Sequence, residues 1–403
     1  MKRAAHFTKN ELRRALRHVA HSDAAGIDGD IGACYRESAG VAAEDAKARA
    51  SKLVNQIHRE LARGTYHFKP VVGRVIRYPS GKTRELAIPT LRDRVVLRAA
   101  ATALADAWGE IPMCVRGGRP GASVGEVARE ATNLLRARPW HILKIDIRRA
   151  FPSTPRRDAL LALRAITDRQ DLVDLLDDFY SAQGERIEGL GQGVAVAPLL
   201  LASLLKTHVV PVLLPACDHL FLWVDDALIF VRDANQALVA RAALAVQLRD
   251  LGMELHPQKM QMVGPCTVLP SSPINELRFL GWAWLTRYPV ASPEAELLLA
   301  ERVTACLEDG SVELAESVIR SWAAAFATPG EACRMVFEHA DELIRGRIAE
   351  IEGGSHPKLP RLVELLPGAV GPAHDERRAS LVGVGPPDIG NPALWQGWAS
   401  SLS

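Results

Sequence analysis

Two adjacent aspartates interrupt one of the most apolar stretches of this 403-residue chain. Asp225 and Asp226 stand inside Leu222–Phe230, whose other residues are typical of a buried β-strand. A buried carboxylate costs several kcal/mol unless it is paired or bound to a metal ion. The two residues therefore indicate a metal site, or a tight hairpin turn, in which adjacent aspartates are also common.

A third aspartate stands in a similar setting. Asp146 lies at the end of the apolar run Trp140–Ile147, where it could instead cap the helix that follows. Two neighbouring strands that both carry acids at one end would form a cluster that Mg²⁺, an ion that prefers oxygen ligands, neutralises. Two such ions, about 3.5–4 Å apart, clamp in-line phosphoryl displacements. The three aspartates together predict a site of this kind.

The composition limits the classes of protein to consider. Hydrophobic residues make up 48% and charged residues 24% of the chain, as in ordinary soluble globular proteins. The six cysteines form no CxxC pair, which argues against a zinc ribbon or a redox dithiol. No apolar run follows Met1-Lys2-Arg3, and Val194–Leu205 is too short to cross a bilayer. We therefore expect a cytoplasmic protein without a signal peptide or a membrane contact.

Charge is unevenly distributed along the chain. Residues 1–100 contain 20 Lys or Arg and 10 Asp or Glu, whereas the whole chain contains 49 and 47. A basic first quarter beside a more acidic remainder suits a phosphate-binding surface near a carboxylate centre. Solvated helix faces are the alternative explanation for part of this basic charge.

Hydrophobic periodicity and turn residues predict an α+β fold in which a small antiparallel sheet is backed by helices. The helices are expected at Lys9–Ala20, Glu44–Arg63, Arg92–Trp108, Glu126–Ala137, Asp158–Tyr180, Val194–Leu205, Asn235–Leu251 and within 291–355. The strands are expected at Val71–Tyr78 and Arg84–Ile88, which form a hairpin, and at Trp140–Ile147, Leu220–Val231 and Leu277–Trp284.

Eight segments between about residues 20 and 285 resemble, in the same order, the motifs of the reverse transcriptase family, especially its bacterial, group II intron-like branch. They are Gly26-Ile27-Asp28-Gly29, Tyr66–Pro70 with Gly81–Pro89, Arg116–Gly121, Asp146–Phe151, Gly189-Leu190-Gly191-Gln192-Gly193 with Ala197-Pro198, Trp223-Val224-Asp225-Asp226, Leu255–Lys259 and Phe279-Leu280-Gly281. Each segment alone is weak, but eight in sequence order are specific.

The resemblance implies a right-hand polymerase. Its expected parts are an N-terminal helical extension (1–63), fingers with part of the palm (64–140), palm (141–290), helical thumb (291–355) and a Pro/Gly-rich tail (356–403). The implied activity is RNA-directed DNA synthesis, in which a primer is extended with dNTPs.

The resemblance also implies the roles of individual residues. Asp146, Asp225 and Asp226 would hold two Mg²⁺ ions, for which Mn²⁺ could substitute, and the backbone carbonyl of Ile147 would complete the second ion's shell. Lys259 would protonate the leaving pyrophosphate; a solvated surface lysine is the alternative.

The remaining implied contacts are to the nucleotide and to the nucleic acid. For the dNTP they come from Lys82, Arg84, Gln192 and Phe151, whose ring would exclude a 2′-hydroxyl or, alternatively, would only fill the core. For the template and primer they come from Arg116, Arg119, Gly193 and Trp223.

Several positions depart from the family pattern. Trp223 replaces the usual Tyr, Gly191 the usual Pro, Ala197 the usual Ser and Ser203 a frequent Asn. After residue 291 the sequence shows no nuclease or zinc-ligand pattern of the type that mobile introns often encode. By analogy, this favours a domesticated enzyme in antiphage defence or beside CRISPR genes.

The expected partners are an RNA template, which a dedicated non-coding RNA could supply, a DNA or RNA primer, dNTPs, and a protein partner or a second copy of the chain. Two other functions suit the same fold. One is DNA synthesis without a template or from a protein primer, and the other is an inactive RNA-binding scaffold.

Phe151→Ala should admit ribonucleotides, because removing the ring makes room for a 2′-hydroxyl. The measurement is the ratio of kcat/KM for a dNTP to that for the matching rNTP, and the expected fall is roughly tenfold or more. An unchanged ratio would show that Phe151 only fills the core.

Overall fold

The computed structural model describes residues 5–20, 35, 43–77, 83–108, 112–117, 123–266, 277–284, 289–308, 310–327, 331–352 and 359–366. The predicted N-terminal motif at 26–29, two predicted site residues, Lys82 and Arg119, and most of the expected tail at 356–403 lie outside these residues.

A five-stranded antiparallel sheet forms the centre of the molecule. Its middle strand, β3 (Trp140–Arg148), pairs with β5 (Asp226–Val231) on one side and with β6 (Glu254–Leu255) and β7 (Gln261–Cys266) on the other, and β4 (His219–Trp223) lies outside β5. The strands are rich in aromatic and β-branched residues, which suit a buried pleated surface. The expected α+β fold is confirmed.

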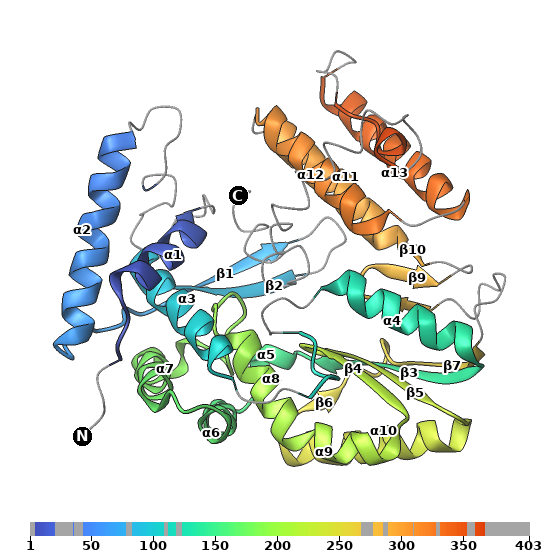
Figure 1. Cartoon of the computed structure of the whole chain (residues 1–403), viewed down its shortest axis with the longest axis horizontal. Helices are drawn as coiled ribbons and strands as arrows, with labels where there is room; N and C mark the ends of the chain where they lie inside the picture. Colours follow the sequence, from blue (N-terminus) through green and yellow to red (C-terminus); the bar gives the residue numbers. More distant parts are fainter. Residues whose placement is uncertain are drawn as a thin grey trace.

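Helices cover both faces of this sheet (Figure 1). Helix α10 (Ala234–Asp250) lies along one face and contacts β3, β5 and β6. Helix α4 (Val124–Ala137) lies over the other face, where the Leu134 carbonyl accepts a hydrogen bond from the Trp140 indole at 2.9 Å. The sheet is therefore enclosed, and a charged side chain on its strands needs a specific partner.

The first quarter of the chain forms a helical unit and a hairpin. Helix α1 (Lys9–Ala20) packs on α3 (Leu91–Asp106), α2 (Ala43–Ala62) lies beside them, and β1 (Val72–Arg77) pairs with β2 (Thr83–Ile88). All five elements agree with the sequence-based prediction to within two residues. The hairpin projects from α3 towards the middle of the molecule (Figure 1).

The segment that links β3 to β4 differs from its prediction. The single helix expected at Asp158–Tyr180 is wrong, because α6 (Arg156–Ile166) ends before α7 (Gln170–Gln183) begins. Thr167 is extended, with φ −126°, and forms a β-bridge with Trp108. Apolar residues continue at helical spacing on both sides of this break, so periodicity could not reveal it.

The connection contains five further elements. They are α5 (Ala150–Ser153), which directly follows β3, a 3₁₀ turn (Gly184–Arg186), α8 (Ala197–His208) and α9 (Val210–Leu213) with a second 3₁₀ turn (Leu214–Ala216). No single described helix has the length and apolarity of a membrane span; Ala197–His208 and Val210–Ala216, which meet at a 42° bend, satisfy both criteria only together.

The last described part forms a small sheet and a helical layer. One strand expected at Leu277–Trp284 is in fact a hairpin of β8 (Leu277–Phe279) and β9 (Trp282–Trp284), because Leu280 and Gly281 have φ of 52° and 80° and turn the chain. The other elements are β10 (Val290–Ala291), α11 (Pro293–Glu308), α12 (Val312–Phe326), α13 (Glu331–Glu352) and a 3₁₀ turn (Leu362–Leu365). The three helices form a separate layer in Figure 1.

The hairpin of β4 and β5 turns through only two residues, Val224 and Asp225, because Trp223 pairs with Asp226. Val224 has φ 57°, as two-residue hairpin turns require at their first position. The hairpin-turn interpretation is therefore correct for Asp225, whereas Asp226 already belongs to a strand.

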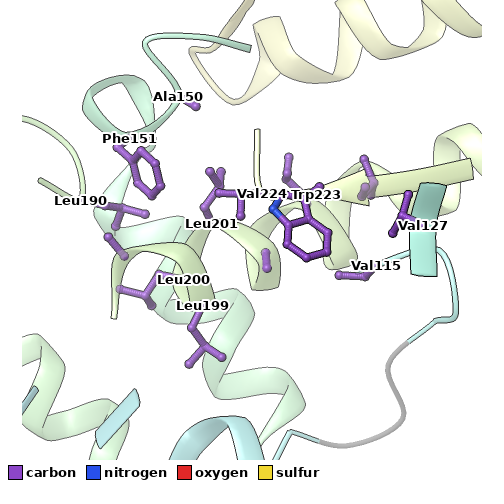
Figure 2. Packing of buried hydrophobic residues seen from close by; sticks show 14 of the residues in the cluster. Val115, Val127, Ala150, Phe151, Leu190, Leu199, Leu200, Leu201, Trp223 and Val224 are labelled. Carbon is purple, nitrogen blue, oxygen red and sulfur yellow. The ribbon is translucent and has the colours of Figure 1, made fainter. Parts of the chain in front are cut away.

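The segment Cys114–Gly117 holds this turn in place. The Arg116 and Gly117 amides both donate to the Leu222 carbonyl, at 2.7 and 3.1 Å, and the Leu222 amide donates to the Cys114 carbonyl at 2.7 Å. Figure 2 shows Val115 of this segment packed near Trp223. A Cβ atom on Gly117 would lie 2.4 Å from the Val224 nitrogen, so only glycine fits there.

Gly117→Ala should lower the free energy of unfolding by roughly 1–3 kcal/mol, because the added methyl overlaps backbone atoms that cannot move freely. Urea unfolding measures the change. The matched control is Gly346→Ala in α13, where a Cβ meets nothing within 4 Å; it should raise the same free energy by up to about 1 kcal/mol. Equal effects at both glycines would contradict the packing of Gly117 on the turn.

Candidate active site

The sheet brings the three predicted aspartates together. Asp146 and Asp226 are directly opposite each other in the antiparallel pair β3–β5, so their side chains project from the same face. Asp225 lies in the adjoining turn, and its carbonyl accepts a hydrogen bond from the Ile147 amide at 3.2 Å. Asp146 is not a helix cap, because β3 continues to Arg148 and Arg149 occupies the N-cap position of α5.

Burial and mutual repulsion make two of these acids weak. Burial, followed by the charge of Asp146, raises the pKa of Asp225 to about 6. Burial, followed by the charge of Asp225, raises the pKa of Asp226 to about 7. Carboxylates crowded in this way resist ionisation unless positive charge is supplied. The site therefore attracts cations.

Lys259 already supplies one positive charge. Its ammonium nitrogen lies 2.7 Å from Oδ2 of Asp146, and the preceding turn is fixed to β3 because the His256 amide donates to the Asp146 carbonyl at 2.8 Å. The Lys259 side chain is 44% exposed and that of Asp146 only 13%, so the lysine reaches the acid from the solvent side. Lys259 is therefore an ion-pair partner of Asp146, and its role towards the pyrophosphate stays a prediction.

The donor chemistry of the site fits magnesium. The three aspartates offer only oxygen ligands, and Mg²⁺ in proteins commonly binds one or two carboxylates while water and substrate oxygens complete its shell. Within the described ranges, no group of three or more His, Cys, Asp or Glu side chains is arranged so that it could hold a metal ion. The match to Mg²⁺ therefore rests on the chemistry of the oxygen donors.

Phe151 lies on the short helix α5, which directly follows the strand that carries Asp146. Its ring is 7% exposed and packs near Leu190 in Figure 2. The Leu190 amide donates to the Phe151 carbonyl at 2.9 Å, and a Cβ on Gly189 would lie 2.2 Å from that oxygen. The glycine-rich segment Gly184–Gly193 is thus in direct contact with the backbone of Phe151.

The same glycine-rich segment contacts the β1–β2 hairpin. The Ala87 amide donates to the Gln192 carbonyl at 2.8 Å, and a Cβ on Gly193 would lie 3.4 Å from the Ala87 carbonyl. Arg84, on the same strand β2, is near enough to oppose the rise in the pKa of Asp225. Backbone contacts thus link the segments that carry Phe151, Gln192 and Arg84, and the nucleotide-binding roles of these residues stay predictions.

Two predicted nucleic-acid contacts are more buried than expected. The Arg116 guanidinium pairs with Glu130 of α4 at 2.5 Å, and the residue is 8% exposed. Trp223 is 3% exposed, and its indole N–H has no hydrogen-bond partner among the residues that the structure describes. In this structure Arg116 joins the segment before the hairpin to α4, and the nucleic-acid roles of both residues stay predictions.

The sequence reasoning missed two residues that shape the site, Lys144 and Arg156. Lys144 opposes the rise in the pKa of Asp226, and its position two residues before Asp146 places both side chains on one face of β3. Strand periodicity could have identified it. Arg156 acts through hydrogen bonds to a distant backbone segment, and no local pattern indicates it. Gly117 and Gly189 belong to the quoted motifs, but only the structure shows their close fit against distant backbone atoms.

Asp226→Asn should stabilise the chelator-treated protein at pH 8 and have little effect at pH 4. The pKa of Asp226 is about 7 in the folded state and about 3.9 in an unfolded chain, so the folded state binds more protons between these values and stability falls as pH rises through them. Asparagine removes this loss, and urea unfolding should show a gain on the order of 1–3 kcal/mol at pH 8.

Asp250→Asn, at the exposed end of α10, is the matched control and should show no such pH dependence. An equal gain for Asp226→Asn at both pH values would mean that Asp226 is not a weak acid in the folded state.

Among solved structures, apo telomerase from Candida tropicalis, truncated from its C-terminal domain, is 12% identical with a TM-score of 0.43; 64% of this chain and 63% of that chain are covered. Telomerase from Candida albicans with a fragment of telomeric RNA is 12% identical with a TM-score of 0.42, over 75% and 64%. This chain thus spans less than two thirds of either telomerase chain.

No curated protein sequence matches this chain significantly. The family model described as reverse transcriptase (RNA-dependent DNA polymerase) matches residues 76–283, which is more than half of the chain and includes all three aspartates. The chain therefore belongs to the reverse transcriptase family.

Proposed function

We propose that this protein is an RNA-directed DNA polymerase that extends a primer with dNTPs by two-metal-ion catalysis. The observation that carries the proposal is the cluster of Asp146, Asp225 and Asp226 at the adjoining ends of β3 and β5, with the pKa of two of them raised by burial and crowding. Buried acids in this arrangement are costly to a fold and are explained by cation-dependent chemistry.

The three aspartates and the Ile147 carbonyl would hold two Mg²⁺ ions, or Mn²⁺ in their place, which activate the primer hydroxyl and stabilise the leaving pyrophosphate. The family as a whole uses divalent metal ions. Because Asp225 and Asp226 are weak acids in the folded protein, we expect metal binding and activity to increase as the pH rises towards 7 and beyond.

The chain's own side chains prepare the substrate. Arg84, whose charge lowers the pKa of Asp225, would bind the triphosphate, a ligand that suits its forked donors. Phe151 would be the sugar selector, whose ring excludes an extra hydroxyl. Lys259 holds a proton next to Asp146, which suits transfer to the departing pyrophosphate.

We further propose a domesticated bacterial, group II intron-like enzyme that acts in antiphage defence in the cytoplasm, on a dedicated non-coding RNA. This rests on the sequence motifs and on their departures from the family pattern, at Trp223, Gly191, Ala197 and Ser203. The division into an N-terminal extension (1–63), fingers (64–140), palm (141–290) and thumb (291–355) belongs to the same proposal.

Metal-dependent nucleotide incorporation tests the proposed activity. The protein is purified with the nucleic acid that accompanies it and is given Mg²⁺ and each labelled dNTP in turn, with and without added RNA template and primer. Asp225→Ala should lower incorporation on the order of a thousandfold or more. Asp250→Ala, which removes an exposed acid outside the site, should leave incorporation unchanged.

Each outcome selects one function. Incorporation of all four dNTPs on added template establishes a general reverse transcriptase, whereas one or two dNTPs, dependent on the bound RNA, indicate a dedicated repeat-making enzyme. Incorporation that survives removal of every nucleic acid indicates template-independent or protein-primed synthesis. No incorporation, or equal incorporation by Asp225→Ala, refutes the proposed catalysis and favours an RNA-binding scaffold.

A further inference from the structure

The glycine-rich segment Gly184–Gly193 contacts Phe151 on one side and strand β2 on the other. Its glycines leave its own backbone poorly constrained. Gly184, Gly189, Gly191 and Gly193 have φ of 56°, 55°, 71° and 94°, which side chains other than glycine rarely allow. A segment with four such residues loses much conformational freedom when it is ordered. Its position must therefore be fixed by contacts from outside the segment.

Arg156, in the first turn of α6, provides two of these contacts. Its Nε donates to the Gly189 carbonyl at 2.5 Å and its Nη1 donates to the Gly184 carbonyl at 2.8 Å. The described residues include no carboxylate within ion-pairing distance of this half-buried guanidinium, and burial lowers its pKa. A charged group that binds only backbone carbonyls is strongly held by them, and the rigid fork of arginine can span both.

Tyr180 of α7 fixes the next residue of the segment. Its hydroxyl donates to the Leu190 carbonyl at 3.0 Å, and the residue is 3% exposed. The Arg156 guanidinium carbon lies 5.7 Å from the centre of the Tyr180 ring, so the two side chains support each other. Together they hold three carbonyls of the segment, those of Gly184, Gly189 and Leu190.

The glycine-rich segment is hydrogen-bonded to the chain on both sides of the site. On one side the Leu190 amide binds the Phe151 carbonyl at 2.9 Å, and Gly189 fits closely against the carbonyls of Phe151 and Pro152. On the other side the Gln192 carbonyl binds the Ala87 amide at 2.8 Å, on the strand that carries Arg84. Movement of the segment therefore moves Phe151 and the Arg84 strand together.

We propose that Arg156, supported by Tyr180, is a positioning residue that sets both the discrimination between deoxy- and ribonucleotides and the affinity for the incoming nucleotide. This inference rests on the proposed polymerase function. Arg156 touches neither the metal ligands nor the reacting groups; it acts through the backbone of Gly184 and Gly189.

The test uses the full chain with Arg156→Ala, Arg156→Lys and Tyr180→Phe. Arg157→Ala is the matched control, since Arg157 carries the same charge in the same helical turn but lies outside the contacts with the glycine-rich segment. Steady-state kinetics with a matched dNTP and rNTP give KM, kcat and the ratio of the two kcat/KM values. Thermal unfolding identifies variants that do not fold.

We expect Arg156→Ala to raise KM for the dNTP and to lower the dNTP/rNTP ratio by between roughly tenfold and a hundredfold, with a smaller effect on kcat. Arg156→Lys should recover only part of the loss, because one ammonium group cannot span both carbonyls. Tyr180→Phe should show the same pattern to a smaller extent, and Arg157→Ala should match the wild type.

Three outcomes are distinguishable. If the wild type incorporates dNTPs but neither KM nor the ratio changes in the folded variants, the positioning role is refuted while the polymerase function stands. If Arg156→Ala does not fold, Arg156→Lys and Tyr180→Phe decide by the same two quantities. If the wild type incorporates no nucleotide, the proposed function itself is refuted, and with it this role of Arg156.

Discussion

The antiparallel pairing of β3 with β5 is the interaction on which the rest of this structure depends. It places Asp146 opposite Asp226 and puts Asp225 at the adjoining turn, so three acids meet at the end of an otherwise apolar sheet. The apolar side chains of β3 and β5 favour this pairing. The charges of the aspartates at the ends of the same strands oppose it. Lys259, Lys144 and Arg84, which lie on three different segments, partly offset the repulsion.

Two segments near the acids pack against main-chain atoms of neighbouring segments. Gly117 lies against the turn at Val224, and Gly189 lies against the carbonyls of Phe151 and Pro152. Such contacts leave no space for a Cβ, so they fix distances between segments more tightly than side-chain packing does. Two chain segments that are far apart in sequence thereby hold the surroundings of the site.

The sequence predicted much of this site, because a buried acid in an apolar strand is a local signal. Asp146, Asp225 and Asp226 could be grouped from their sequence context alone, and helices such as Lys9–Ala20 agree with the structure to the residue. Where prediction failed, the determining contact was long-range. Thr167 breaks a helix because it pairs with Trp108, and the turn at Leu280-Gly281 divides a strand whose apolar pattern continues. Arg116 has the sequence context of a surface cation, and only the fold brings it to Glu130.

At Val224, selection for stability and selection for catalytic activity act on different properties of the residue. A β-branched residue at φ 57° is strained by about 1–2 kcal/mol, yet its side chain is 6% exposed, and its burial contributes about the same amount with the opposite sign. Glycine at this position would remove both contributions and leave the free energy of unfolding nearly unchanged, whereas alanine would keep the strain and lose the burial. An exchange of Val224 for glycine would therefore be silent in stability, and a change in turnover through the adjoining Asp225 would be its visible effect.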